Sequence, residues 1–398
     1  MTGKNLYYAF TNTQVINMIN IKNSIYPDTH ADIYIIDNGR ISKELITRLN
    51  DKKIFDNIYY LKHHPYSNLR KSIRKLPEFI RKPLMFSFIT LNYLHYQLTF
   101  HKQKSRKYNT MFLSGFWSDG VYFIKNYYKY NNHLKIYFVE EGTANYSYTI
   151  TQLCYLFESL HPLACILWKI TTGGNKESDI KFFNSIINGM YLYLPQNYQL
   201  ETETALLTLP PITHSVDTQE IMINTISENI FERYRAHNVI YFMQDQSTDV
   251  NQYKVFLEYI QKITTTESLR TLIKQHPDFN VNQVPFGNII ENLPNTVIDC
   301  DDYLLEGIYA KINLDNKILI TRDSSSVMYP KYMFSKEPVV IFTYKLYQTY
   351  YSEKGDGLDT HMQNLAKTYT DHSKIYAPTS IKELEEILLT RINKNIIS

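Results

Sequence analysis

The stretch that decides the fold runs from Leu6 to Gly39 and reads LYYAFTNTQVINMINIKNSIYPDTHADIYIIDNG. An apolar run at 6–10 is followed by polar residues and then by a helix-like apolar pattern at 15–21, and a second apolar run at 31–36 ends in the turn sequence DNG. Short apolar runs bounded by turn residues are typical of buried strands. The stretch therefore predicts strand, helix and strand, which is the opening of a doubly wound α/β domain.

The same alternation of strand and helix continues along the chain and then begins again. Further strands are predicted at 57–61, 110–114, 134–139, 238–243, 271–274, 297–300, 317–321 and 338–342. Between the two series stands Leu209-Pro210-Pro211, which suits a linker because proline breaks regular structure. We predict two Rossmann-like α/β domains, 1–210 and 211–398. Since such sheets bind ligands beyond the carboxyl ends of their strands, we expect the domains to face a central cleft.

Composition limits the class of protein. With 398 residues the chain exceeds what one hydrophobic core supports, and its 44% hydrophobic content indicates a globular protein. A net charge of +3 is too small to indicate a nucleic-acid partner. The three cysteines, Cys154, Cys165 and Cys300, lack the close spacing of zinc or disulfide frameworks, and the first ten residues are too short an apolar run for a signal peptide. We therefore expect a cytoplasmic protein.

One segment departs from the α/β pattern. Residues 62–107 carry eleven Lys or Arg against one acid, Glu78, and their middle, 84–100, is apolar and aromatic. Polar residues and short length make 84–100 a poor transmembrane span. Two interpretations have equal weight: a peripheral segment that lies on the anionic inner face of a membrane, or a buried helix with solvated basic ends.

The first candidate for chemistry is Glu140-Glu141-Gly142, directly after the predicted strand 134–139. A carboxylate at the carboxyl end of a strand lies where α/β proteins bind ligands, and the glycine lets the backbone turn tightly. Such a carboxylate could accept a proton from a sugar hydroxyl, and the like charge of its neighbour would raise its pKa. The alternative is a plain loop.

The second candidate is Lys274-Gln275-His276-Pro277, again at the end of a predicted strand. Proline restricts the residue before it to extended geometry, so the His276 imidazole has a defined direction. A protonated histidine there could stabilise a leaving phosphate, and Lys274 could add positive charge. A histidine at a surface turn is the alternative.

The third candidate is Ser324-Ser325-Ser326, after the predicted strand 317–321. Serine hydroxyls and backbone N–H groups at a helix start suit a phosphate, although they also serve as simple helix caps. Between the second and third motifs lies Glu306, which could accept the two hydroxyls of a ribose. An acidic start of a helix is the alternative for Glu306.

The order of these motifs resembles the bacterial sialyltransferases that modify lipooligosaccharide and capsule. In that family an acid-acid-glycine motif supplies the general base, and a His-Pro motif and a Ser-Ser or Ser-Thr motif contact the CMP phosphate. The resemblance implies a GT-B type fold and transfer of sialic acid from a CMP-sugar donor to a saccharide or glycolipid acceptor. It covers the three motifs and the two-domain architecture only.

Roles follow from the resemblance residue by residue. It implies that Glu140 is the base and Glu141 its acidic neighbour, that His276 and Pro277 contact the phosphate, and that Ser325 and Ser326 are the serine pair, with Ser324 as an alternative register. Glu306 matches the ribose ligand by its position between motifs. The family often has aspartate at the base position, and because glutamate is longer, Glu141 is an alternative base.

The sequence also bears on metal and donor. The first half has no Asp-x-Asp pair for a divalent ion, and a CMP sugar carries a single phosphate that histidine and serine could neutralise, so we expect no cofactor and activity without metal. The motifs indicate a phosphate-binding site and a general base, and they do not indicate which sugar is transferred. CMP-Kdo or a UDP-hexose are therefore alternative donors. A non-catalytic polysaccharide-assembly protein is the alternative of another class.

Overall fold

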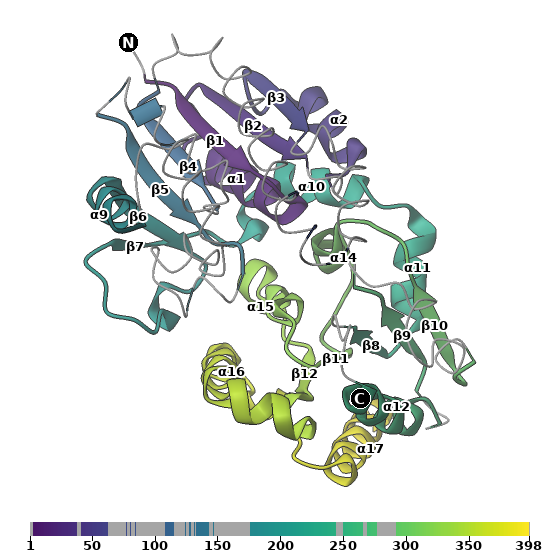
Figure 1. Cartoon of the computed structure of the whole chain (residues 1–398). Coiled ribbons are helices and arrows are strands. Elements are labelled where there is room, and N and C mark those ends of the chain that lie inside the picture. The colour runs from purple at the N-terminus through teal and green to yellow at the C-terminus, as the bar shows by residue number, and fades with distance from the viewer. Residues whose placement is uncertain are drawn as a thin grey trace. The chain divides into compact units, whose positions relative to one another are not determined.

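The structure is a computed structural model, drawn in Figure 1. It describes residues 3–37, 41–62, 77, 80, 84, 108–114, 124, 127–128, 131, 133–142, 146, 176–243, 250–265, 269–276 and 292–397. The basic segment 62–107 lies almost wholly outside these ranges. None of the helices within them is long and apolar enough to cross a membrane.

The chain divides into two compact units. Unit 1 comprises Met1–Pro210 with His214–Ile221, and unit 2 comprises Pro211–Thr213 with Met222–Ser398. The predicted division at residue 210 put the segment 214–221 in the second domain, whereas the structure puts it in unit 1. That segment belongs to unit 1 because the Asn23 amide donates to the Ser215 and Thr218 hydroxyls, at 3.4 and 3.3 Å.

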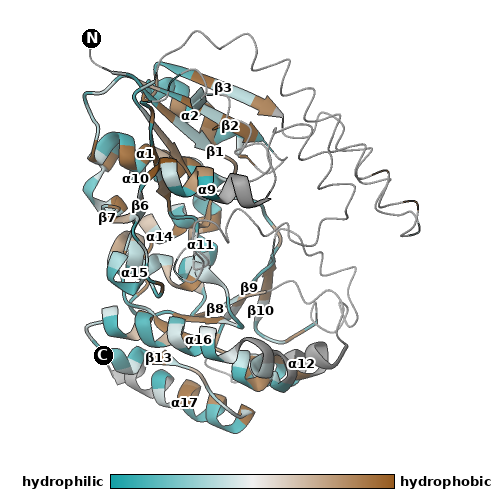
Figure 2. Ribbon diagram, turned by 60° about the vertical axis from the view of Figure 1, so that its left-hand side comes forward, coloured by the Kyte–Doolittle hydropathy of each residue, from teal (hydrophilic) through white to brown (hydrophobic). Residues whose placement is uncertain are grey.

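In unit 1 the hydrophobic strands alternate with helices. Its elements are β1 (Asn5–Ala9), α1 (Asn12–Ser24), β2 (Ala31–Asp37), α2 (Lys43–Lys52), β3 (Asn57–Lys62), β4 (Thr110–Leu113), β5 (Lys135–Val139), α9 (Lys176–Ile186), β6 (Ile187–Leu192), η1 (Pro195–Asn197) and β7 (Ala205–Thr208). After them come η2 (Ile212–His214) and α10 (Val216–Asn224), which contributes to both units. β1 is buried along its whole length, β2 is buried except at Asp37, and β2 is mostly hydrophobic (Figure 2). Runs buried on both faces are expected of a parallel sheet covered by helices.

Unit 2 repeats this plan. Its elements are α11 (Glu228–Ala236), β8 (Val239–Phe242), α12 (Val250–Thr265), β9 (Thr271–Lys274), β10 (Thr296–Asp299), α14 (Leu305–Lys311), β11 (Ile318–Thr321), η4 (Ser325–Val327), α15 (Tyr329–Phe334), β12 (Val339–Phe342), η5 (Tyr344–Leu346), α16 (Gln348–Thr368), η6 (His372–Lys374), β13 (Ile375–Tyr376) and α17 (Ile381–Ile397). β8, β11 and β12 are buried along their whole length.

The two sheets have the same strand order. Among the described residues, the order is β3-β2-β1-β4-β5-β6-β7 in unit 1 and β10-β9-β8-β11-β12-β13 in unit 2. Every pairing between these strands is parallel. In such sheets the order reverses between β1 and β4, and between β8 and β11, and ligands bind beyond the carboxyl ends of the strands at this point.

All ten strands predicted from the sequence are confirmed to within about one residue at each end. In the part of the chain that the structure describes, three strands were missed: β6, β7 and β13. β6 contains Asn188-Gly189, a pair that indicates a turn. Glycine fits here because a Cβ at Gly189 would lie 3.0 Å from the carbonyl oxygen of Ala205 on β7. β13 has only two residues, too few to show a period, and β7 is an edge strand without a fully buried residue, so it lacks the pattern of a buried strand.

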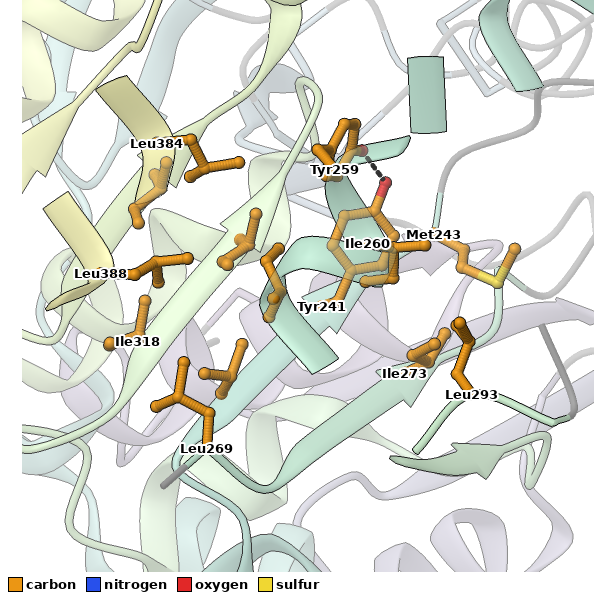
Figure 3. Close-up of a cluster of buried hydrophobic side chains, with 14 of the residues drawn as sticks. Tyr241, Met243, Tyr259, Ile260, Leu269, Ile273, Leu293, Ile318, Leu384 and Leu388 are labelled. Carbon is orange, nitrogen blue, oxygen red and sulfur yellow. Dashed lines mark hydrogen bonds between the residues drawn. The ribbon is translucent and has the colours of Figure 1, made fainter. Parts of the chain in front are cut away.

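The core of unit 2 contains a chain of buried tyrosine hydroxyls, part of which Figure 3 shows. The hydroxyl oxygens of Tyr241 and Tyr259 lie 2.7 Å apart, and those of Tyr259 and Tyr347 lie 3.0 Å apart. A buried hydroxyl without a partner is costly, and in this chain of rings each hydroxyl lies within hydrogen-bonding distance of the next. The chain joins β8, α12 and the start of α16.

Gly307 fixes how closely α14 approaches α10. A Cβ at Gly307 on α14 would lie 2.6 Å from the carbonyl oxygen of Met222 and 2.6 Å from Cδ1 of Ile226. We predict that Gly307→Ala lowers the free energy of unfolding by about 1 to 2 kcal/mol, measured by urea denaturation.

The matched control is Gly357 on α16, where an added Cβ meets nothing within 4 Å. Gly357→Ala should raise stability by about 0.5 to 1 kcal/mol through the helical preference of alanine. Equal effects of the two substitutions would contradict the close packing of α14.

Candidate functional site

Glu140 follows β5 and its side chain points into unit 1. The carboxylate is only 1% exposed, and its Oε2 accepts hydrogen bonds from the Tyr146 hydroxyl at 2.5 Å and from the Tyr193 N–H at 2.8 Å. The Tyr146 hydroxyl also accepts from the Leu194 N–H at 3.2 Å. Glu140 thus ties the end of β5 to the end of β6.

The backbone of Glu140 is held as firmly as its side chain. Its N–H donates to the carbonyl of Tyr191 at 2.9 Å, and its carbonyl accepts from the Asn17 amide at 2.8 Å. The Tyr193 hydroxyl in turn donates to Oδ1 of Asn17 at 2.7 Å. Glu140, the first residue of the motif, therefore has little freedom to move.

The amide of Asn17 belongs to a stripe along α1. Gln14, Asn17, Asn20 and Asn23 are spaced by three residues, so the row winds around the helix and its members reach different neighbours. Gln14 Oε1 accepts from the Phe10 N–H at 2.6 Å, and Asn20 donates to the carbonyl of Pro210 at 2.6 Å. Sequence analysis missed this stripe, although the spacing of its amides within an apolar helix was a visible signal.

Glu141 differs from its neighbour in exposure. It is partly buried rather than fully buried, and the Gln14 amide lies beside its carboxylate. Burial raises the pKa of Glu141 to about 7, and the Gln14 amide lowers it by a smaller amount. Glu141 is therefore the member of the pair that combines partial exposure with a pKa suited to proton transfer near neutral pH.

The pKa of Glu140 is also raised to about 7, by burial, against the lowering effect of the Tyr146 and Tyr193 hydrogen bonds. The sequence predicted that the like charge of the neighbour would contribute. That explanation is corrected here: for both carboxyls the dominant cause is removal from water, which disfavours the charged form.

In unit 2 the predicted residues lie at the carboxyl edge of one sheet. His276 is the second residue after β9 and is partly exposed, and Ser324 is the third residue after β11. Only β8 separates β9 from β11, so the two strand ends are two strand spacings apart, about 10 Å. The serines lie at the point where the strand order reverses.

The serine run forms a capped turn. Ser324 is the N-cap of η4, and its hydroxyl accepts from the Ser326 N–H at 3.2 Å and donates to the Ser326 hydroxyl at 3.0 Å. The Ser326 hydroxyl accepts this bond, so its own hydrogen is a donor for a ligand. Arg322, which sequence analysis did not single out, lies at the same turn, is nearly buried and pairs with Asp323 at 3.3 Å.

Lys274 is engaged elsewhere. Its ammonium donates to the carbonyl of Asp301, lies 3.9 Å from the Asp299 carboxylate and stands 4.4 Å from the ring centroid of Tyr303. Burial lowers the pKa of Lys274, which the neighbouring aspartates oppose. This placement does not favour the predicted role of Lys274 at a donor phosphate.

Asp299 is the centre of this charged cluster. It is fully buried, and it accepts from Arg233 at 3.0 Å and from the Tyr234 and Tyr303 hydroxyls. Its carbonyl accepts from the Gln275 N–H at 2.9 Å. Because Gln275 precedes His276, the cluster fixes the backbone from which the histidine projects.

The structure describes Glu306 but not Pro277, the two remaining residues of the predicted donor site. Glu306 lies in the first turn of α14 and is 4% exposed, which does not favour contact with a ribose in this structure. Pro277 lies outside the described residues. Among those that the structure describes, no group of three or more His, Cys, Asp or Glu side chains could hold a metal ion.

Comparisons with known proteins bear on the fold. No protein-family model matches the sequence, and no curated protein matches it. The fold is similar to that of a Methanocaldococcus jannaschii UDP-GlcNAc 2-epimerase solved with UDP-GlcNAc and UDP, with a TM-score of 0.50 and 10% identity over 98% of this chain and 93% of that one. This likeness and the two sheets confirm the predicted fold class of two Rossmann-like units of the GT-B type.

Other solved structures give weaker likenesses. UDP-GlcNAc 2-epimerase from Neisseria meningitidis, bound to UDP-GlcNAc, has a TM-score of 0.47 and 12% identity over 98% of this chain and all of that one. Arabidopsis thaliana UGT89C1, complexed with UDP, has a TM-score of 0.48 and 10% identity over 96% of this chain and 94% of that one.

Burial of Glu140 should make stability depend on pH. Its folded-state pKa of about 7 lies above the ordinary 4.5, so between these values the folded chain binds more protons than the unfolded chain and stability falls as pH rises. Urea denaturation measures the free energy of unfolding of Glu140→Gln minus that of the unmodified chain. This difference should rise by about 2 to 3 kcal/mol from pH 5 to pH 8. Glu258→Gln, on the exposed face of α12, is the control and should show no such trend.

The charged cluster of unit 2 gives a second test. Asp299→Asn should lower the free energy of unfolding by about 2 to 3 kcal/mol, because a buried carboxylate that accepts from Arg233 is lost. Asp301→Asn removes a carboxylate that contacts the same guanidinium at 3.0 Å but is 55% exposed, so it should cost less than about 1 kcal/mol. Equal losses would show that Asp299 is not the centre of the cluster.

Proposed function

We propose that this protein is a glycosyltransferase that moves sialic acid from CMP-sialic acid to a hydroxyl of a saccharide or glycolipid, without a metal and with inversion. The observation that carries the proposal is the sheet order β9-β8-β11, which puts His276 and the serine turn at one carboxyl edge of unit 2. A histidine and hydroxyl donors at one edge of a sheet suit a single phosphate.

The acid pair at the end of β5 supports the same chemistry. An acceptor hydroxyl must lose its proton as it attacks the donor, and the pKa of both carboxyls is about 7, which suits a general base near neutral pH. The bond between the anomeric carbon and the phosphate oxygen breaks, and CMP leaves with the electron pair. In this mechanism His276 and Ser326 stabilise the charge that grows on the leaving phosphate.

A second candidate donor is a UDP-sugar. It is favoured by the likeness of the fold to an epimerase solved with UDP-GlcNAc and UDP. A serine turn and a histidine recognise phosphate and do not by themselves distinguish CMP from UDP. CMP-Kdo would fit the same phosphate contacts, and a protein that binds CMP without turnover would correspond to a role in polysaccharide assembly.

The donor site is tested by thermal shift. CMP should raise the melting temperature by mass action, and the rise should persist in the presence of a chelator. His276→Ala should reduce this shift and slow transfer together, because the same contact strengthens as the phosphate gains charge. Ser326→Ala should lose about 0.5 to 1.5 kcal/mol of binding, the scale of one neutral hydrogen bond.

UDP is the matched control ligand. A larger shift with UDP than with CMP, or a shift that requires manganese, would replace CMP-sialic acid by a UDP-sugar as donor. A panel of donors with mass detection of the transferred sugar then identifies the sugar.

A further inference from the structure

The two neighbouring acids at the end of β5 are held in different ways. Glu140 has hydrogen bonds on its backbone N–H, on its backbone carbonyl and on Oε2. Its side chain is 1% exposed, whereas Glu141 is partly exposed. A base must come within about 3 Å of the hydroxyl whose proton it takes. Glu140 is closed off from solvent and part of Glu141 is accessible, so Glu141 is the acid that a bound hydroxyl can reach.

On the premise of the proposed function, we propose that Glu141 takes the proton of the acceptor and that Glu140 is a positioning residue. The acceptor O–H bond breaks and its proton passes to the Glu141 carboxylate. The oxygen forms the new bond to the anomeric carbon of the donor, from which CMP departs with its electron pair. Glu140 takes no proton from the acceptor and fixes the backbone from which Glu141 projects.

The contacts of Glu140 show how it positions its neighbour. Oε2 accepts from the Tyr146 hydroxyl and the Tyr193 N–H, which lie on segments 6 and 53 residues away along the chain. Asn17 on α1 closes the arrangement by binding both the Glu140 carbonyl and the Tyr193 hydroxyl. On the other side of the turn, the Gln14 amide of the same helix lies beside Glu141. α1 therefore holds the support through Asn17 and carries Gln14 next to the proposed base.

Replacing each acid by glutamine in turn distinguishes the proposed base, Glu141, from the positioning residue, Glu140. Glu141→Gln should lower the transfer rate by about 100- to 10,000-fold, the scale of losing a general base, while the KM for the donor changes less than about threefold. It should also abolish the acidic limb of the pH–rate profile near pH 7. Glu140→Gln keeps an oxygen that can accept from Tyr146 and Tyr193, so its rate should stay within about tenfold of the unmodified chain.

A third variant tests positioning itself. Glu140→Leu removes both acceptor oxygens and should lower the rate by about 100-fold, yet it should keep the acidic limb of the profile because the base is intact. Recovery of the rate in Glu140→Gln relative to Glu140→Leu is the expected sign of a hydrogen-bonding role. Loss of the acidic limb in Glu140→Gln together with its retention in Glu141→Gln would overturn the assignment.

An accessibility measurement needs no turnover. Carbodiimide-promoted amidation of the whole chain at pH 6, followed by peptide mass spectrometry, should modify Glu141 and leave Glu140 protected, and the reverse pattern would overturn the proposal. If the unmodified chain transfers no sugar from any CMP or UDP donor, the proposed function fails and this assignment fails with it. If it does transfer and Glu141→Gln retains most of the rate, only the assignment fails.

Discussion

The hydrogen bond from the Asn17 amide to the carbonyl of Glu140 is the contact on which the arrangement of unit 1 depends. Asn17 is fully buried, and a buried amide without partners would cost about 1 to 3 kcal/mol. α1 meets this requirement at Asn17, Asn20 and Asn23, whose amides bind Glu140, Pro210 and Ser215. The helix thereby sets the position of the β5 end, of residue 210 and of the start of α10.

In unit 2 a buried polar group also needs partners, and there the group is a carboxylate that is paired with charged side chains. Asp299 is buried among Arg233, Lys274 and two tyrosine hydroxyls, and this pairing makes its burial tolerable. The consequence for function is that Lys274, although it stands two residues before His276, already has its charge compensated. Arg322 at the serine turn is the cation nearest in sequence to the proposed phosphate ligands, and its charge is likewise compensated, by Asp323.

Both units place their candidate residues beyond the carboxyl ends of parallel strands. In this fold the strands supply a rigid frame, while the residues after them are free to differ between proteins. That explains how the chain shares its fold with a UDP-GlcNAc 2-epimerase at only 10% identity. It also explains why the chemistry of this protein must be argued from its own strand ends rather than from the likeness of the frame.

The sequence by itself determined the fold class and the strands with strong apolar runs, because burial on both faces leaves a continuous hydrophobic pattern that needs no other part of the chain to be recognised. It also placed the acid pair, the histidine and the serines at strand ends. Only the tertiary structure decided which of these side chains are exposed. Glu140 and Glu141 are adjacent and chemically identical, and they differ because Tyr146, Tyr193 and Asn17 enclose one of them. Burial, and the pKa it sets, depends on residues distant in sequence that meet only when the chain has folded.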